Sequence, residues 1–416
     1  MDKFIIKNTQ KLNGTIEIGG AKNAVLPLMT ACIINPGKYK INNVPILRDT
    51  VTMAKLLEMV GAEVKIKGNS FSINTKKCNT PFAPYELVKT MRASFYVLGP
   101  FMARFNKAQV SLPGGCAWGP RPVDFHIKAL EKMGAKISLK GGYIKAEGKL
   151  KGCDIIFDKS SVGATGNVMM AAVTASGITK IQNSAKEPEI DCLMDFLNLM
   201  GADITRDENG DIIIKGVKKL NDEIEFDVIP DRIEAGTFMI ATAMCKGKVT
   251  LKNIIPEHLS ILTNKLIESG CKIDIKEKTL TIEMRNRPKA IDMITAIYPG
   301  FPTDLQAQWM ALMTIASGSS TVTDTIYTDR FTHIAELERL GADIHLDTNV
   351  AHINGVSKLF GAEVMSTDIR ASASLVIAGL AAQGETNISR IYHIDRGYEK
   401  IEEKILKIGG NIKRLK

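Results

Sequence analysis

A loop rich in glycine and proline carries the residue with the most reactive chemistry in the chain. Residues 112–124 read Leu-Pro-Gly-Gly-Cys-Ala-Trp-Gly-Pro-Arg-Pro-Val-Asp, so that Cys116 lies five residues before Arg121. A neighbouring cation favours the thiolate, and Cys116 could therefore act as an acid or as a nucleophile. A surface loop with an incidental cysteine fits equally well, because the sequence shows no partner base.

Cations stand where helices are expected to begin. Lys22 follows Gly19-Gly20-Ala21, Arg92 opens an apolar segment, and Arg370 follows Asp368. Helix N-termini expose free amides and a positive dipole end, which attract phosphate or carboxylate. An ordinary helix cap does not account for a cation, so these three residues indicate an anion site.

Acidic and small residues at equivalent places have a simpler interpretation. Asp231 and Asp368 are expected to be ordinary caps, and the small residues of 161–166 would let a ligand approach the backbone. Asp304 follows the turn at 298–302 and could be a general base. It could equally cap the next helix, and taken alone the cap is favoured.

The elements that must position these residues recur six times. A helix ending in Leu-Gly-Ala or a close variant returns at intervals of about 70 residues. The marker glycines are Gly61, Gly134, Gly201, Gly270, Gly341 and Gly409. Each copy reads α-β-α-β-β, and three copies per lobe with a cleft between the lobes is the economical division. The sixth copy lacks a strand partner, which residues 4–6 or 15–18 could supply.

Composition indicates a soluble cytoplasmic protein that binds small anions. Hydrophobic residues make up 45% of the 416 residues, and no apolar run approaches the ~18 residues of a membrane span. Seven cysteines without a Cys-x-x-Cys pair predict reduced thiols and no metal site. The net charge of +9 is spread along the chain, which favours an anionic substrate over nucleic acid. His126, just after the loop, is a candidate ligand contact.

Seven ordered blocks resemble the UDP-N-acetylglucosamine 1-carboxyvinyltransferase family of enolpyruvyl transferases, over essentially the whole chain. The blocks are residues 19–24, 113–124, 161–165, 230–234, 301–308, 370–374 and 395–398. The resemblance implies an inside-out α/β barrel of two lobes, residues 22–229 and residues 1–21 with 230–416, with the ligand cleft between them. It implies no cofactor, no metal, no membrane and no nucleic acid.

The activity that the resemblance implies is transfer of the enolpyruvyl group of phosphoenolpyruvate to the 3'-hydroxyl of UDP-N-acetylglucosamine, with release of phosphate. This is the first committed step of peptidoglycan precursor synthesis, and so bears on cell wall biogenesis, cell shape and cell division. One alternative is the sister enzyme that acts on 3-phosphoshikimate. The other is a non-catalytic six-repeat protein that binds anions.

The resemblance also implies roles for individual residues. Asp304 is similar to the base, Cys116 to the loop acid that fosfomycin labels, and Lys22 and Arg396 to further catalytic cations. Phosphoenolpyruvate would be surrounded by Lys22, Arg92, Arg121, Arg370 and Arg396. The sugar nucleotide would contact Asn23, Arg121, Pro122, Val123, Asp124, Phe125, Lys159, Ser161, Val162, Gly163, Asp304, Ile326 and Arg330.

Overall fold

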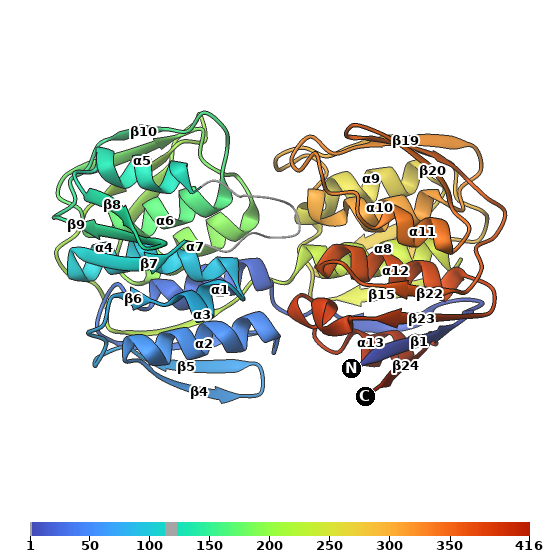
Figure 1. Cartoon of the computed structure of the whole chain (residues 1–416), viewed down its shortest axis with the longest axis horizontal. Helices are drawn as coiled ribbons and strands as arrows, with labels where there is room; N and C mark the ends of the chain where they lie inside the picture. The colour runs from blue at the N-terminus through green and yellow to red at the C-terminus, as the bar shows by residue number, and fades with distance from the viewer. Residues whose placement is uncertain (1, 113–122) are drawn as a thin grey trace. The chain divides into compact units, whose positions relative to one another are not determined.

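The computed structural model describes residues 2–112 and 123–416, and it divides into two units, each with its own hydrophobic core (Figure 1). The first unit is Gly20–Ile229, and the second combines Met1–Gly19 with Pro230–Lys416. Cys116, Arg121 and Pro122 lie outside the described residues.

The first unit contains copies one to three. Its elements are α1 (Lys22–Ala31), β3 (Lys38–Asn42), α2 (Arg48–Val60), β4 (Glu63–Lys67), β5 (Ser70–Asn74), β6 (Phe82–Ala83), α3 (Tyr85–Val88), η1 (Arg92–Val97), α4 (Leu98–Phe105), β7 (Lys107–Ser111), α5 (Asp124–Lys132), β8 (Lys136–Lys140), β9 (Tyr143–Glu147), β10 (Asp154–Ile156), α6 (Val162–Ala172), β11 (Ile178–Gln182), α7 (Pro188–Leu199), β12 (Asp203–Arg206), β13 (Ile212–Lys215) and β14 (Glu223–Asp227).

The second unit contains copies four to six and the start of the chain. Its elements are β1 (Lys3–Lys7), β2 (Asn13–Glu17), α8 (Arg232–Met244), β15 (Lys248–Lys252), η2 (Pro256–Leu259), α9 (Ser260–Glu268), β16 (Lys272–Lys276), β17 (Thr279–Glu283), β18 (Met293–Ile294), η3 (Thr303–Leu305), α10 (Gln306–Met313), β19 (Ser319–Thr323), α11 (Ile334–Arg339), β20 (Asp343–Asp347), β21 (Val350–Asn354), β22 (Glu363–Met365), α12 (Ile369–Ala381), β23 (Glu385–Ser389), η4 (Ile391–Arg396), α13 (Ile401–Lys407) and β24 (Asn411–Leu415).

Copies one to five each contribute three strands to one four-stranded sheet, and a strand from outside the copy completes it. The sixth copy contributes two strands, β23 and β24, to its sheet. The first unit has the orders β14-β3-β5-β4, β6-β7-β9-β8 and β10-β11-β13-β12. The second has β16-β17-β15-β2, β18-β19-β21-β20 and β22-β23-β1-β24. A parallel strand lies at one edge of all six sheets, such as β14 beside β3, and the α-β-α-β-β pattern did not predict it.

The start of the chain completes two sheets of the second unit. β1 lies between β23 and β24 and runs antiparallel to both, with Lys3 opposite Leu415. The expectation that residues 4–6 supply the missing partner of the sixth copy is therefore confirmed. Residues 15–17 belong to β2, which instead pairs in parallel with β15 of the fourth copy.

Helices lie inside each unit and sheets lie outside (Figure 1). In α6 every residue from Ala164 to Ala172 is buried, and α8, α10 and α12 of the second unit are buried on nearly all sides and pack on one another. A helix that is apolar all round must lie in a core. Strands such as β3 alternate exposed and buried side chains, as expected for a sheet with one face on the core. The predicted inside-out α/β arrangement is confirmed.

All six marker glycines have a positive φ, between 85° and 110°. Glycine reaches this left-handed region without the Cβ clash that other residues meet, and it ends the helix there. Among the described residues, no helix is both long and apolar enough to cross a membrane.

Candidate active site

The carboxylate of Asp304 lies between two buried guanidinium groups. Arg330 Nη1 is 3.0 Å from Asp304 Oδ1, and Arg370 Nη2 is 2.8 Å from Asp304 Oδ2. The arginine side chains are 9% and 6% exposed, whereas that of Asp304 is 26% exposed. Both oxygens of the Asp304 carboxylate thus contact guanidinium groups.

The two arginines determine the charge state of Asp304. Burial alone raises the pKa of the carboxyl, but the charges of Arg370 and Arg330 outweigh it and hold the pKa well below its usual range. For Arg370, burial lowers the pKa of the guanidinium, and the opposing effect of Asp304 leaves it raised. Asp304 is therefore ionised at neutral pH, and its low pKa makes it a weak base while both arginines remain in place.

Arg370 is supported on a second side by a buried polar network. Its Nη1 donates to the hydroxyl of Tyr398 at 3.4 Å, and that hydroxyl lies 2.8 Å from Thr237 Oγ1. Gln308 Nε2 also donates to Tyr398, at 3.2 Å. Arg396 ends η4, which packs on α12, so the second unit places Arg396 on an element adjacent to the helix that carries Arg370.

The expected helix caps are confirmed. The Asp231 carboxylate accepts from the amides of Ile233 and Glu234 at 2.8 and 3.1 Å. Asp368 accepts from the amide of Arg370 at 2.7 Å and thereby fixes the first turn of α12. Ser161, a candidate substrate contact, caps α6 through the amide of Ala164 at 3.3 Å.

In the first unit, Lys22 is the first residue of α1 and is paired with an acid. Its Nζ lies 3.0 Å from Asp49 Oδ2, and both side chains are largely buried, at 11% and 5% exposed. Asn23, the next residue, is exposed. Asp49 is a residue that sequence reasoning missed, because an acid in the first turn of a helix usually faces solvent.

His126 is a core residue in the structure. It is buried, its Nδ1 lies 3.0 Å from Asn167 Nδ2, and its ring meets Phe95 edge-on at 5.0 Å. Burial and then the charge of Arg92 lower the pKa of the imidazole to about 3, so the ring is neutral. The expectation that His126 contacts a ligand is not supported by these contacts. Arg92, whose charge acts on it, is the first residue of η1.

Of the predicted sugar-nucleotide residues of the first unit, those at 123–125 and 161–163 lie where α5 and α6 begin. A Cβ placed on Gly163 would lie 3.4 Å from the His126 ring, so the first turns of these helices are in contact. Asp124 Oδ2 pairs with Lys128 at 3.7 Å, while Oδ1 is buried and has no hydrogen-bond partner among the described residues. Val123, Phe125 and Val162 are partly buried beside them, and Lys159 is exposed.

The remaining two predicted contacts lie in the second unit, on the segment after β19. Ile326 is 37% exposed, and Arg330 is the buried partner of Asp304 described above. Asp324, which begins this segment, is fully buried and was not singled out from the sequence.

The six described cysteines are poor candidates for chemistry. Burial raises the pKa of each thiol, to about 11 for Cys78 and about 12 for Cys192, Cys245 and Cys271. Cys32 and Cys153 are shifted in the same direction by burial. Within the described ranges, no three His, Cys, Asp or Glu side chains are grouped so as to hold a metal ion.

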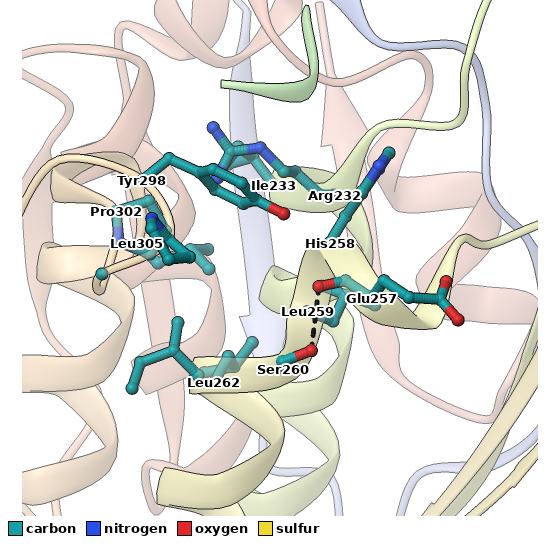
Figure 2. Close-up of a pocket in the computed structure, with 13 residues that line it drawn as sticks. Arg232, Ile233, Glu257, His258, Leu259, Ser260, Leu262, Tyr298, Pro302 and Leu305 are labelled. Atoms are coloured by element: carbon teal, nitrogen blue, oxygen red, sulfur yellow. Dashed lines mark hydrogen bonds between the residues drawn. The ribbon is translucent and has the colours of Figure 1, made fainter. Parts of the chain in front are cut away.

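A small pocket of the second unit lies beside the Asp304 region (Figure 2). Its volume is about 90 Å³, and its wall includes Arg232, whose guanidinium faces the ring of Tyr298 at 5.5 Å. Pro302 and Leu305, on either side of the Thr303-Asp304 pair, also line it, but none of the predicted site residues does. Pockets that hold drug-sized ligands are roughly 300–1,000 Å³, so this one is too small for a sugar nucleotide.

The chain belongs to the family of enolpyruvyl transferases described as EPSP synthase (3-phosphoshikimate 1-carboxyvinyltransferase), whose model matches residues 6–405. Among its relatives, the UDP-N-acetylglucosamine 1-carboxyvinyltransferase of Geobacter metallireducens is 51% identical over 417 residues. That of Hydrogenovibrio crunogenus is 49% identical over 417 residues. Each alignment covers 100% of both chains.

Solved structures support the same fold. The enolpyruvyl transferase NikO from Streptomyces tendae matches with a TM-score of 0.90 and 22% identity, over 99% of this chain and 98% of that one. EPSP synthase from Acinetobacter baumannii matches with a TM-score of 0.77 and 19% identity, over 100% of both chains. At these identities the likeness shows the two-unit fold alone.

Proposed function

We propose that the chain transfers the enolpyruvyl group of phosphoenolpyruvate to the 3'-hydroxyl of UDP-N-acetylglucosamine and releases inorganic phosphate. The observation that carries the proposal is the Asp304 carboxylate between Arg330 and Arg370. The name shared by full-length relatives with about half of their residues identical supports the choice of acceptor. The same proposal places the step in the cytoplasm, in peptidoglycan precursor synthesis, and so in cell wall growth and division.

The reaction requires one base, one acid and several cations. Asp304 takes the proton from the sugar hydroxyl, whose oxygen then bonds to carbon 2 of phosphoenolpyruvate. Cys116 protonates the methylene carbon, which gives a tetrahedral adduct that still carries phosphate. Loss of a proton from the new methyl group and departure of phosphate then restore the double bond. Lys22 and Arg396 stabilise the charge that develops on the phosphate and carboxylate.

The contacts with Arg330 and Arg370 impose a condition on this role for Asp304. With both arginines paired to it, the pKa of the carboxyl is too low for efficient proton transfer. A bound phosphate or carboxylate shares the positive charge of Arg370, and this weakens its hold on Asp304. The pKa of Asp304 then rises, so the base gains strength when phosphoenolpyruvate is present.

The cations on the first unit complete the anion site in this proposal. Lys22 and Arg92 begin helical segments, and Arg121 belongs to the Cys116 loop. In this proposal the substrate touches these residues and also Asp304 and Arg396, so it contacts residues of both lobes, residues 22–229 and residues 1–21 with 230–416.

The sugar nucleotide is assigned to the starts of α1, α5 and α6. The unsatisfied Asp124 Oδ1 offers an acceptor for a ligand N–H or O–H group, because leaving such an atom unpaired is costly. Gly163 and Val162 bring backbone amides to the ligand at the N-terminus of α6, where the helix dipole favours diphosphate. Asn23 is exposed and able to reach the sugar.

A phosphate-release assay tests the proposal directly. The chain is mixed with phosphoenolpyruvate and either UDP-N-acetylglucosamine or 3-phosphoshikimate, and phosphate is measured over time. We expect phosphate release when the acceptor is UDP-N-acetylglucosamine and none when it is 3-phosphoshikimate. Release with 3-phosphoshikimate alone would point to the sister enzyme, and release with neither would point to an anion-binding protein.

A further inference from the structure

Asp324 is a buried carboxylate that the reaction described above does not use. It follows β19 directly, and its residue exposure is 0%. Its Oδ1 accepts from Thr295 Oγ1 at 2.8 Å and from the backbone amides of Ile326 and Tyr327, both at 2.9 Å. Its Oδ2 accepts from Thr303 Oγ1 at 2.7 Å. Four donors therefore converge on one carboxylate.

The bond to Thr303 continues to the catalytic carboxylate. A hydroxyl has one proton, and Thr303 gives it to Asp324, so its oxygen is left to accept. Arg330 Nη1 donates to that oxygen at 3.1 Å and to Asp304 Oδ1 at 3.0 Å. Because a guanidinium can only donate, the hydrogen bonds run in one direction, from Arg330 to Thr303 and from Thr303 to Asp324.

A second route from Asp324 reaches the same guanidinium. The amide bonds to Ile326 and Tyr327 close the turn that leads to Arg330, and the Arg330 guanidinium lies 5.7 Å from the centre of the Tyr327 ring. The turn is tied further by Thr325, which donates its amide to Thr295 Oγ1 at 3.0 Å. The position of Arg330 thus depends on Asp324 through a side chain and through the backbone.

We propose that Asp324 is a positioning residue for the transfer reaction, which holds the Arg330 guanidinium on Asp304 through Thr303 and holds Ile326 toward the sugar nucleotide through its backbone. The inference rests on the proposed function and deepens it. Asn in place of Asp324 would turn an NH2 group toward a donor, because an amide offers one oxygen where the carboxylate offers two.

Two threonine-to-valine variants, matched in shape, distinguish a positioning role of Asp324 from a purely structural one. Thr303→Val removes the hydroxyl between Asp324 and Arg330. Thr314→Val is the control, because it removes a buried hydroxyl of the same unit that donates to the carbonyl of Ala311 and takes no part in either route from Asp324 to Arg330. Thr303→Ser restores the hydroxyl and serves as the conservative rescue.

Phosphate release is measured for wild type and variants at temperatures where each is folded. For Asp324→Asn and Thr303→Val, kcat is expected to fall about 10- to 100-fold, the scale of a misplaced group in an active site. For Thr303→Ser and Thr314→Val, kcat is expected to stay within about 3-fold of wild type. Equal losses in both valine variants, in step with their melting temperatures, would overturn the proposal.

The dependence of kcat on pH gives a readout that a structural role does not move. Arg330, on the segment after β19, and Arg370, on α12, are charged groups in direct contact with Asp304. If Arg330 is loosened, the pKa of Asp304 rises, and the acid limb of the profile moves to higher pH in Thr303→Val. An unmoved limb would contradict the positioning role.

A crystal structure of Thr303→Val separates this inference from the proposed function. The Arg330 Nη1 to Asp304 Oδ1 contact, now 3.0 Å, is expected to lengthen or break. Its retention would refute the inference whatever the substrate of the enzyme. Absence of phosphate release by wild type would refute the proposed function. The Arg330–Asp304 contact in the Thr303→Val structure would still decide whether Asp324 positions Arg330.

Discussion

Arg370 donates to Asp304 across 2.8 Å, although the two residues are 66 positions apart in the chain. The guanidinium is itself anchored by the first turn of α12, whose cap is Asp368, and by the hydroxyl of Tyr398. A carboxylate and a cation held this way share charge before any ligand binds. If an anionic substrate binds the same guanidinium, as proposed, it changes the basicity of Asp304 by sharing the charge of Arg370.

Asp304→Asn is expected to lower turnover by about 10²–10⁴-fold, the contribution of a general base. Binding of UDP-N-acetylglucosamine, measured by calorimetry, should remain largely intact. Stability should also fall by about 1–3 kcal/mol, because Arg330 and Arg370 lose a charged acceptor while buried.

The control for that variant is Asp343→Asn on β20, where the carboxylate is exposed and accepts from Asn354. It should change neither turnover nor stability by a measurable amount. An Asp304→Asn enzyme that is less heat-stable and yet nearly as active would make Asp304 a structural residue.

Two buried histidines predict that the chain loses stability in mild acid. Burial, with the charge of Arg92 adding to it, lowers the pKa of His126 to about 3. For His333 the pKa falls to about 4, chiefly through burial. The unfolded chain takes up these protons near pH 6.5 while the folded chain does not. Stability is therefore complete above pH 6.5 and declines as the pH falls, by about 2 kcal/mol per histidine at pH 5.

His126→Gln tests this linkage, because glutamine stays neutral and can still bond to Asn167. The slope of unfolding free energy against pH between 4 and 6 should flatten by about 1.4 kcal/mol per pH unit in the transition of the first unit. Chemical denaturation at a series of pH values measures it. An unchanged slope would mean that His126 is protonated in the folded chain.

Much of the fold could be predicted because its signals are local and repeat. The marker glycines and the alternating strands depend on a few neighbouring residues, and six copies allow each to be checked against the others. The parallel edge strands could not be found this way. β6 and β18 are two residues long and show no periodicity, and they exist only because a neighbouring copy offers an open strand edge.

The site was predictable as a set of residues and much less as a set of contacts. Asp304 occupies a sequence position that suits a cap and a base alike, and only the fold brings Arg330 and Arg370 to it. Asp49 and Asp324 were missed for a related reason. A buried acid looks like a surface acid in sequence, because its partners are distant in the chain.

If the substrate contacts both lobes as proposed, saturating UDP-N-acetylglucosamine should make the chain more compact in small-angle scattering. Lys22 lies in the first unit and Asp304 in the second, so one ligand that touches both would link the two units, and exclusion of water from such a site strengthens charge contacts. A sugar nucleotide that saturates the protein and leaves the radius of gyration unchanged would contradict the cleft.

Cys116 is expected to be the one thiol that reacts with fosfomycin, and to react faster when UDP-N-acetylglucosamine is bound. The six described cysteines have pKa values raised by burial, so their thiolate fractions are small at neutral pH. Mass mapping should find a single label at Cys116, which Cys116→Ser abolishes. Cys116→Asp should remain partly active and resistant, because a carboxylic acid can give the proton but attacks an epoxide poorly. A label at Cys32, Cys78 or another cysteine would refute the assignment.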